Sequence, residues 1–209
     1  RLHGCGRRHF CGLSGGAGPA FWAIDPTIPD AGSDAANLFA DRVDCNTYMN
    51  WSTGIVTILF SGLDASRRYD IALYANRGEE AYWDRWTQVA ISDVMSYDER
   101  SSAGATVISA TPTGGVTRII SGMNNAGLLF RYDNVNPGPD GDVLLSVSGR
   151  GDVSTYLNAF MIRTAAGGST QDVAGAGYLV DQVRGAIGSP IAIVSGWDMD
   201  WTGGCVTGG

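Results

Sequence analysis

The feature that most constrains this chain is a series of short apolar runs, each bounded by turn residues. Between residues 21 and 163 these runs are rich in β-branched and aromatic residues, as in TGIVTILFSGL, DVLLSVSG and STYLNAFMIR. This spacing is typical of β-sandwiches and barrels, in which short strands are joined by tight turns. The abundance of glycine, 30 of 209 residues, fits many such turns. We therefore predict an all-β fold.

Alternation within two runs predicts which side chains point inward. In the first run these are Val143, Leu145 and Val147, and in the second they are Tyr69, Ile71 and Leu73. In a half-buried strand one such face packs on the core and the other meets solvent. Turn residues at 62–66, 112–115 and 137–141 mark connections between strands. Residues 34–43 are the one segment with helical potential, with Asp34 as its capping residue.

The chain divides into three parts. Residues 1–20 form a Gly- and Cys-rich arm, residues 21–163 the sandwich domain, and residues 164–209 a C-terminal extension with two further strand-like runs. The extension can pack as an edge strand of its own domain, or it can pair with the edge of a neighbouring subunit. The candidate interface residues are Tyr178, Leu179, Val180, Ile191, Ile193, Trp197, Met199 and Trp201.

The charged residues exclude several functions. The chain has fourteen arginines and no lysine, and its net charge is 14 − 21 = −7. A Schiff-base lysine and a phosphate-binding-loop lysine are therefore impossible, and a nucleic-acid partner is not expected. No apolar run reaches the roughly 18 residues of a membrane helix, so we expect no membrane insertion.

Four cysteines predict two disulfides in an extracellular or cell-surface protein: Cys5, Cys11, Cys45 and Cys205. Three pairings are possible, and we favour Cys5 with Cys11 and Cys45 with Cys205, because the short first loop closes easily. A zinc site made by His3, Cys5, His9 and Cys11 is the alternative. Asn50 begins the N-glycosylation sequon Asn-Trp-Ser.

One loop combines aromatic, acidic and basic residues in a pattern that suits ligand recognition. Its candidate ligand-binding residues are Tyr82, Trp83, Asp84, Arg85 and Trp86. Aromatic rings stack on sugar faces or bury at protein interfaces, while Arg and Asp give directional hydrogen bonds. For Trp86 taken alone we favour the alternative, which is burial in the core.

Catalytic and metal-binding patterns are weaker. Glu79, Glu80, Asp84 and Glu99 could act as paired glycosidase carboxylates, but nothing in the sequence holds two of them across a cleft. The only histidines are at positions 3 and 9, which disfavours a serine triad. We predict no enzyme and no cofactor apart from calcium, whose candidate ligands are Asp133, Asn136, Asp140 and Asp142.

Seven short motifs between residues 53 and 163 resemble the galactose-binding-domain-like jelly-roll modules of secreted bacterial proteins. They lie at 60–66, 69–71, 75–77, 85–87, 124–125, 137–142 and 156–160. The resemblance implies a jelly-roll β-sandwich that is typically non-catalytic and often binds glycans through loops at one end, sometimes with a structural calcium.

These observations predict a non-catalytic extracellular structural or adhesive protein that self-associates. The alternative function is a carbohydrate-binding module, with a glycan or a cell surface as the partner. A glycoside hydrolase or esterase is the third alternative.

Overall fold

The chain folds into two antiparallel sheets and one smaller sheet. The computed structural model describes residues 10–14, 20–23, 28–39, 45, 47–51, 54–151 and 153–165. The six-stranded sheet has the order β1 (Phe10–Ser14), β4 (Val56–Ser61), β11 (Val143–Gly149), β6 (Trp86–Ser92), β9 (Gly114–Ile120), β8 (Thr106–Thr111). The four-stranded sheet has the order β13 (Ala159–Thr164), β5 (Tyr69–Tyr74), β10 (Leu129–Pro137), β7 (Val94–Glu99). The predicted all-β sandwich is confirmed.

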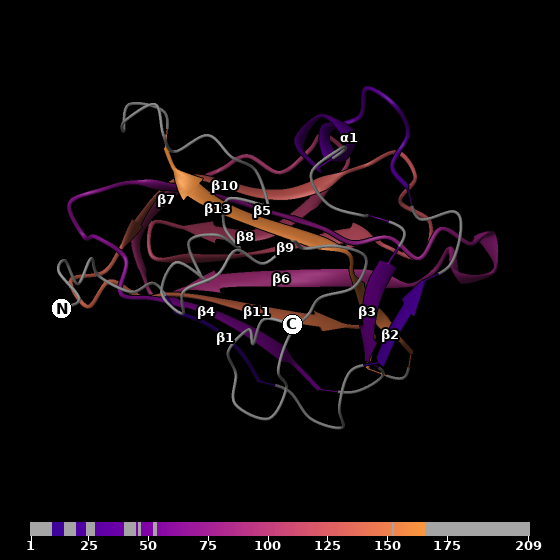
Figure 1. Ribbon diagram of the computed structural model, residues 1–209, viewed down its shortest axis with the longest axis horizontal. Helices are drawn as coiled ribbons and strands as arrows, with labels where there is room; N and C mark the ends of the chain where they lie inside the picture. Colours follow the sequence, from indigo (N-terminus) through magenta and orange to yellow (C-terminus); the bar gives the residue numbers. More distant parts are fainter. Residues whose placement is uncertain are drawn as a thin grey trace, which may run out of the picture.

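The two large sheets lie as two layers (Figure 1), and the buried hydrophobic residues come from both of them. Val143, Leu145 and Val147 of β11 are completely buried, as their alternation predicted. Phe60 of the six-stranded sheet contacts Phe160 of the four-stranded sheet, with ring centroids 6.1 Å apart. Apolar side chains from the facing sides of both sheets therefore bury a common interior.

Strand β5 departs from the predicted alternation because both of its faces are buried. Every residue from Tyr69 to Tyr74 is buried, including Asp70 at 6% exposure. β5 lies between β13 and β10. The Asp70 carboxylate can be buried because it forms an ion pair on the outer face, where Nε of Arg163 lies 3.2 Å from its Oδ2. The expectation of one solvent-facing side was therefore wrong for this strand.

The described residues form one α-helix, α1 (Asp34–Phe39), and one 3-10 helix, η1 (Glu80–Tyr82), and α1 contributes Ala35 and Phe39 to the buried cluster. It is shorter than the predicted segment, whose residues 40–43 lie outside the described part. Ser33 rather than Asp34 caps it, because the Ala36 N–H donates to Ser33 Oγ across 3.2 Å. Figure 1 places α1 beyond the four-stranded sheet, away from the six-stranded sheet.

A three-stranded sheet joins one end of the sandwich, with the order β12 (Thr155–Leu157), β3 (Thr47–Trp51), β2 (Ala20–Ala23). β12 and β13 are nearly continuous and are separated only by Asn158. The chain therefore changes from the small sheet to the four-stranded sheet at this residue. Asn50, the predicted glycosylation position, lies in the middle strand of the small sheet and pairs with Ala20 and Tyr156.

Buried asparagine amides hold the loops at this end together. Oδ1 of Asn76 accepts the N–H groups of Gly78 and Asn124 at 2.9 and 2.7 Å. Nδ2 of Asn124 donates to the carbonyls of Ala75 and Leu128 at 3.0 and 2.9 Å. Amides that satisfy backbone groups in this way fix the loop positions, because an unpaired buried group would be costly. Three of the resembling motifs, at 75–77, 124–125 and 156–160, meet in this network.

Two edges of the six-stranded sheet carry features that the sequence did not indicate. The Gly-rich arm contributes β1, whose Phe10 to Ser14 pair with Ser61 to Thr57 of β4. At the other edge, all six residues of β8 are exposed, and its pairing with β9 shifts register between Val107 and Ser109. The described residues include no helix long and apolar enough to cross a membrane.

Several predictions fall on residues outside the described part of the chain. They include residues 166–209 of the C-terminal extension with its candidate interface residues, both histidines, Cys5 and Cys205. Cys45 is buried, and its carbonyl accepts a hydrogen bond of 3.1 Å from Nδ2 of Asn158. The disulfide pairing and the zinc alternative therefore stay predictions.

Candidate functional site

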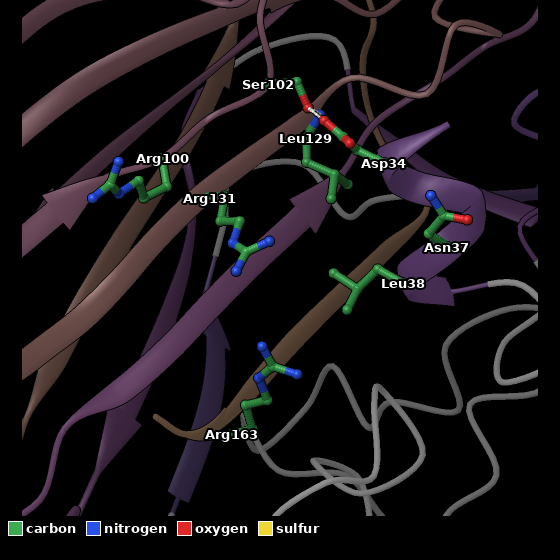
Figure 2. A pocket seen from close by; sticks show the side chains of 8 residues that line it. All are labelled: Asp34, Asn37, Leu38, Arg100, Ser102, Leu129, Arg131 and Arg163. Atoms are coloured by element: carbon green, nitrogen blue, oxygen red, sulfur yellow. Dashed lines mark hydrogen bonds between the residues drawn. The ribbon is translucent and has the colours of Figure 1, made fainter. Parts of the chain in front are cut away.

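A pocket of about 350 Å³ lies between α1 and the outer face of the four-stranded sheet. We call it the arginine pocket, and its lining residues are Asp34, Asn37, Leu38, Arg100, Ser102, Leu129, Arg131 and Arg163. Figure 2 shows the three arginines on one side and the three α1 residues on the other. Its size is in the range of sites for small ligands.

Carboxylates hold two of the three arginines in place. Arg131 forms two hydrogen bonds to Asp133, from Nε to Oδ1 at 2.8 Å and from Nη2 to Oδ2 at 3.0 Å. Its hydrogen bond with Asp133 raises the pKa of Arg131, against the opposing effect of burial. Arg163 donates from Nε to Asp70. Because these ion pairs leave other guanidinium N–H groups unused, both side chains retain donors for a ligand.

Arg100 has no hydrogen-bonding or ionic partner for its side chain within the described residues, and it is exposed. Its position is nevertheless fixed by the backbone, because its N–H donates to the carbonyl of Arg131 at 2.9 Å. The following residues, Ser101 and Ser102, continue alongside β10 and also hydrogen-bond to its backbone. Arg100, which is available to bind an anion, therefore lies on a segment whose backbone is held by hydrogen bonds.

The opposite wall supplies hydrogen-bond acceptors and apolar surface. Oδ2 of Asp34 accepts a hydrogen bond from Oγ of Ser102, which links α1 to the sheet side of the pocket (Figure 2). Nδ2 of Asn37 donates to the carbonyl of Gly32 at 3.1 Å, which leaves its Oδ1 available. Leu38 and Leu129 complete the lining. The pocket can therefore bind a ligand that carries both hydroxyl groups and an anionic group.

The predicted aromatic loop is divided between two environments. The side chains of Tyr82 and Arg85 stack on one another, with the Arg85 guanidinium carbon 3.9 Å from the centroid of the Tyr82 ring. Arg85 also donates to the hydroxyl of Tyr156. These cation–π contacts fix the loop. Tyr82 and Arg85 therefore have packing roles.

Trp83 is the most exposed aromatic residue of the loop, with 68% of its surface exposed. Asp84 is bound by Arg150, with Nη1 2.7 Å from Oδ2. Trp86 is half-buried, and the guanidinium carbon of Arg118 lies 4.1 Å from its ring centroid. The expected burial of Trp86 in the core was wrong. Its place in β6 gives the reason, because Trp86 shares a face with half-buried Gln88 and Ala90, whereas Thr87 and Val89 are buried.

Arg77 carries a buried donor without a described partner. The residue is 8% exposed, and its guanidinium carbon lies 5.2 Å from the Tyr48 ring and 5.0 Å from the Tyr82 ring. Its Nη2 is 2.6 Å from Oε1 of Glu79, whereas Nη1 has no hydrogen-bond partner in the described structure. The Glu79 carboxylate considered for catalysis is thus held by an arginine.

The remaining carboxylates are not gathered into a metal site. Among the described residues no group of three or more His, Cys, Asp or Glu side chains could hold a metal ion. Asp133 pairs with Arg131, Asn136 accepts from Arg68 at 3.1 Å, and Asp140 accepts the N–H of Asp142 at 3.2 Å. Glu99 accepts from Thr117 at 2.8 Å.

Sequence reasoning missed the arginine pocket because its residues are distant along the chain. Along the sequence, adjacent basic residues occur only as pairs such as Arg67-Arg68. The available signal was a charged residue within an apolar strand, as in GLLFRYDNV and AFMIRT. Such a residue predicts an ion pair on the outer face of a sheet.

In comparisons with known proteins, no family model, no curated protein and no solved structure matches the chain. The fold itself defines an antiparallel β-sandwich with a polar pocket on one outer face.

Proposed function

We propose that this chain is a non-catalytic, extracellular binding module of the galactose-binding-domain-like kind, and that its ligand is a glycan. The arginine pocket is the observation that carries this proposal. Arg100, Asp34 and Asn37 offer donors and acceptors at the lining, and half-buried Leu38 adds an apolar side chain beside them. A sugar ring has hydroxyl groups at its edges and C–H groups on its faces, so it suits a lining of this mixed character.

The test is binding to a glycan array by the full chain and by two variants. Asn37→Trp places a large side chain at the exposed wall of the pocket, and we expect it to abolish binding while the protein stays folded. Trp83→Ala removes the exposed aromatic group of the other candidate loop, and we expect binding to persist. Loss of binding in Trp83→Ala with retention in Asn37→Trp would move the site to the aromatic loop. Absence of binding to every glycan would refute the proposed function.

A second candidate function, self-association in a surface or filament structure, is favoured by the exposed edge strand β8. Residues 101–117 contain no charged side chain, and Val107 and Ile108 are 47% and 48% exposed. An edge strand without charge or proline is open to pairing with another strand, and a second copy meets no like-charge repulsion there. The register shift at 107–109 bends the strand, which limits the length over which two copies can pair.

Light scattering of the full chain over a concentration series tests this second function. Ile108→Lys introduces a charge on the edge, and we expect it to shift the protein to the monomer. Ile55→Lys is the matched control, because Ile55 is 53% exposed but lies outside β8. A monomer at all concentrations, or equal effects of both variants, would refute pairing through β8.

A further inference from the structure

We propose that the arginine pocket selects a sugar that carries a carboxylate, such as a uronic acid, and that Arg100 binds this group. This inference rests on the proposed glycan-binding function and names the class of sugar. It depends on how the donors, acceptors and charges are distributed within the pocket.

The unused donors lie on one side of the pocket. Asp133 occupies Nε and Nη2 of Arg131, so its Nη1 remains. Asp70 binds Nε of Arg163, so both of its terminal nitrogens remain. The Arg100 guanidinium has no described partner at all. Figure 2 shows the guanidinium groups of Arg131 and Arg163 turned toward one another on the sheet side of the pocket, while that of Arg100 extends outward beside them.

A carboxylate satisfies this arrangement better than a hydroxyl group does. It only accepts hydrogen bonds, and its two oxygens match the planar fork of a guanidinium. A sugar hydroxyl brings one proton that finds no acceptor among three arginines. Arg is also better suited than other cations to bidentate binding of a carboxylate.

On the sheet side, only one arginine lacks a described carboxylate partner, which indicates one anionic group rather than several. Two of the three cations already have carboxylate partners, Asp133 and Asp70, which leaves Arg100 as the unneutralised cation among them. Asp34 on the helix side would repel an anion placed there, because its described partner is the neutral hydroxyl of Ser102. The carboxylate therefore faces the arginines, and the neutral hydroxyls face Asp34 and Asn37.

The protein's overall charge sharpens this expectation. The chain has a net charge of −7, so its long-range field repels anions. Selection of an acidic sugar must then come from short-range contacts inside the pocket, and removal of the Arg100 charge should have a large effect. A nonspecific polyanion would not bind by charge alone.

The experiment compares a galacturonic acid trisaccharide with a neutral galactose trisaccharide by isothermal titration calorimetry. We expect the acidic sugar to bind at least about tenfold more tightly, and Arg100→Gln to weaken its binding about tenfold or more. Arg67→Gln is the matched control, because Arg67 is an exposed arginine that does not line the pocket, and we expect the affinity of this variant for the acidic sugar to be unchanged.

Each other outcome is decisive. Equal or tighter binding of the neutral sugar would overturn the inference and leave the proposed glycan-binding function standing. Binding of the acidic sugar that survives both Arg100→Gln and Arg100→Glu would place the carboxylate elsewhere and also overturn it. Failure of both sugars to bind overturns this inference, whereas the glycan array decides the proposed function independently. Thermal denaturation verifies that the variants fold, which the exposure of Arg100 leads us to expect.

Discussion

The backbone N–H of Asn76 donates a hydrogen bond of 2.6 Å to Oδ1 of Asn158, a residue 82 positions further along the chain. Asn76 is completely buried and Asn158 is 1% exposed. Asn76 follows β5, and Asn158 marks the point at which the chain passes from the small sheet to the four-stranded sheet. This one contact therefore joins two sheets at the end of the sandwich.

The first prediction concerns this contact. Asn158→Ala leaves the N–H of Asn76 and the carbonyl of Cys45 without their present partner, and we expect it to lower the free energy of unfolding by about 3 kcal/mol. Asn37→Ala is the control, because the Asn37 amide is exposed, and its effect should stay within about 0.5 kcal/mol. Urea denaturation measures both. Equal losses would show that the buried network contributes nothing special.

A second prediction tests how closely the aromatic loop packs on the turn after β9. A Cβ atom at Gly122 would lie 1.6 Å from the carbonyl oxygen of Tyr82, which is backbone and cannot rotate away. We expect Gly122→Ala to cost about 2 kcal/mol or more and to move the loop. Gly151→Ala is the matched control, because nothing lies within 4 Å of its Cβ position. Comparable thermal midpoints for both variants would contradict this packing.

The sequence predicted the strands whose apolar pattern is strong and missed those without it. β11 was expected because its alternate residues are apolar, and the structure buries those residues. β7 has the sequence VMSYDE, in which only Val94 is fully buried, so its pattern reads as a loop. β1 was missed because its strand character comes from pairing with β4, whereas the glycine-rich sequence around it favours turns.

The candidate site was less predictable than the fold. The loop at 82–86 was recognised because its aromatic residues are adjacent, yet only Trp83 among them is strongly exposed. The arginine pocket combines Arg100, Arg131 and Arg163, which are neighbours only because β10 and β13 flank β5. A sequence without a known topology cannot place distant residues on one sheet face. Local patterns therefore predicted layers better than sites.

A third prediction concerns Arg77, which lies between the rings of Tyr48 and Tyr82. Arg77→Lys keeps the positive charge near Glu79 but replaces a flat guanidinium with a compact ammonium that cannot stack on two rings. We expect a loss of about 1–2 kcal/mol in the free energy of unfolding. Arg67→Lys, at a residue whose side chain is 51% exposed, should change it by less than about 0.5 kcal/mol. No difference between the two substitutions would refute a stacking role.

The last prediction is loss of stability at alkaline pH. Burial raises the pKa values of Tyr48, Tyr74, Tyr97, Tyr132 and Tyr156 above their ordinary value of 10.0, most strongly for Tyr74 and Tyr132. Below pH 10 these hydroxyls are protonated in both states, so they make no difference. Above pH 10 the unfolded chain loses the protons first, and stability falls by up to about 1.4 kcal/mol per pH unit for each tyrosine that stays protonated in the fold.

Chemical denaturation at several pH values between 9 and 12 measures this slope, and absorbance at 295 nm follows tyrosine ionisation in the same samples. Tyr132→Phe is the informative variant, because the hydrogen bond of the Tyr132 hydroxyl to the carbonyl of Val89 is long, at 3.5 Å. It should fold, bind one proton fewer, and lose stability less steeply as the pH rises. A slope equal to that of the wild-type protein would mean that Tyr132 ionises normally in the folded chain, and that burial does not raise its pKa.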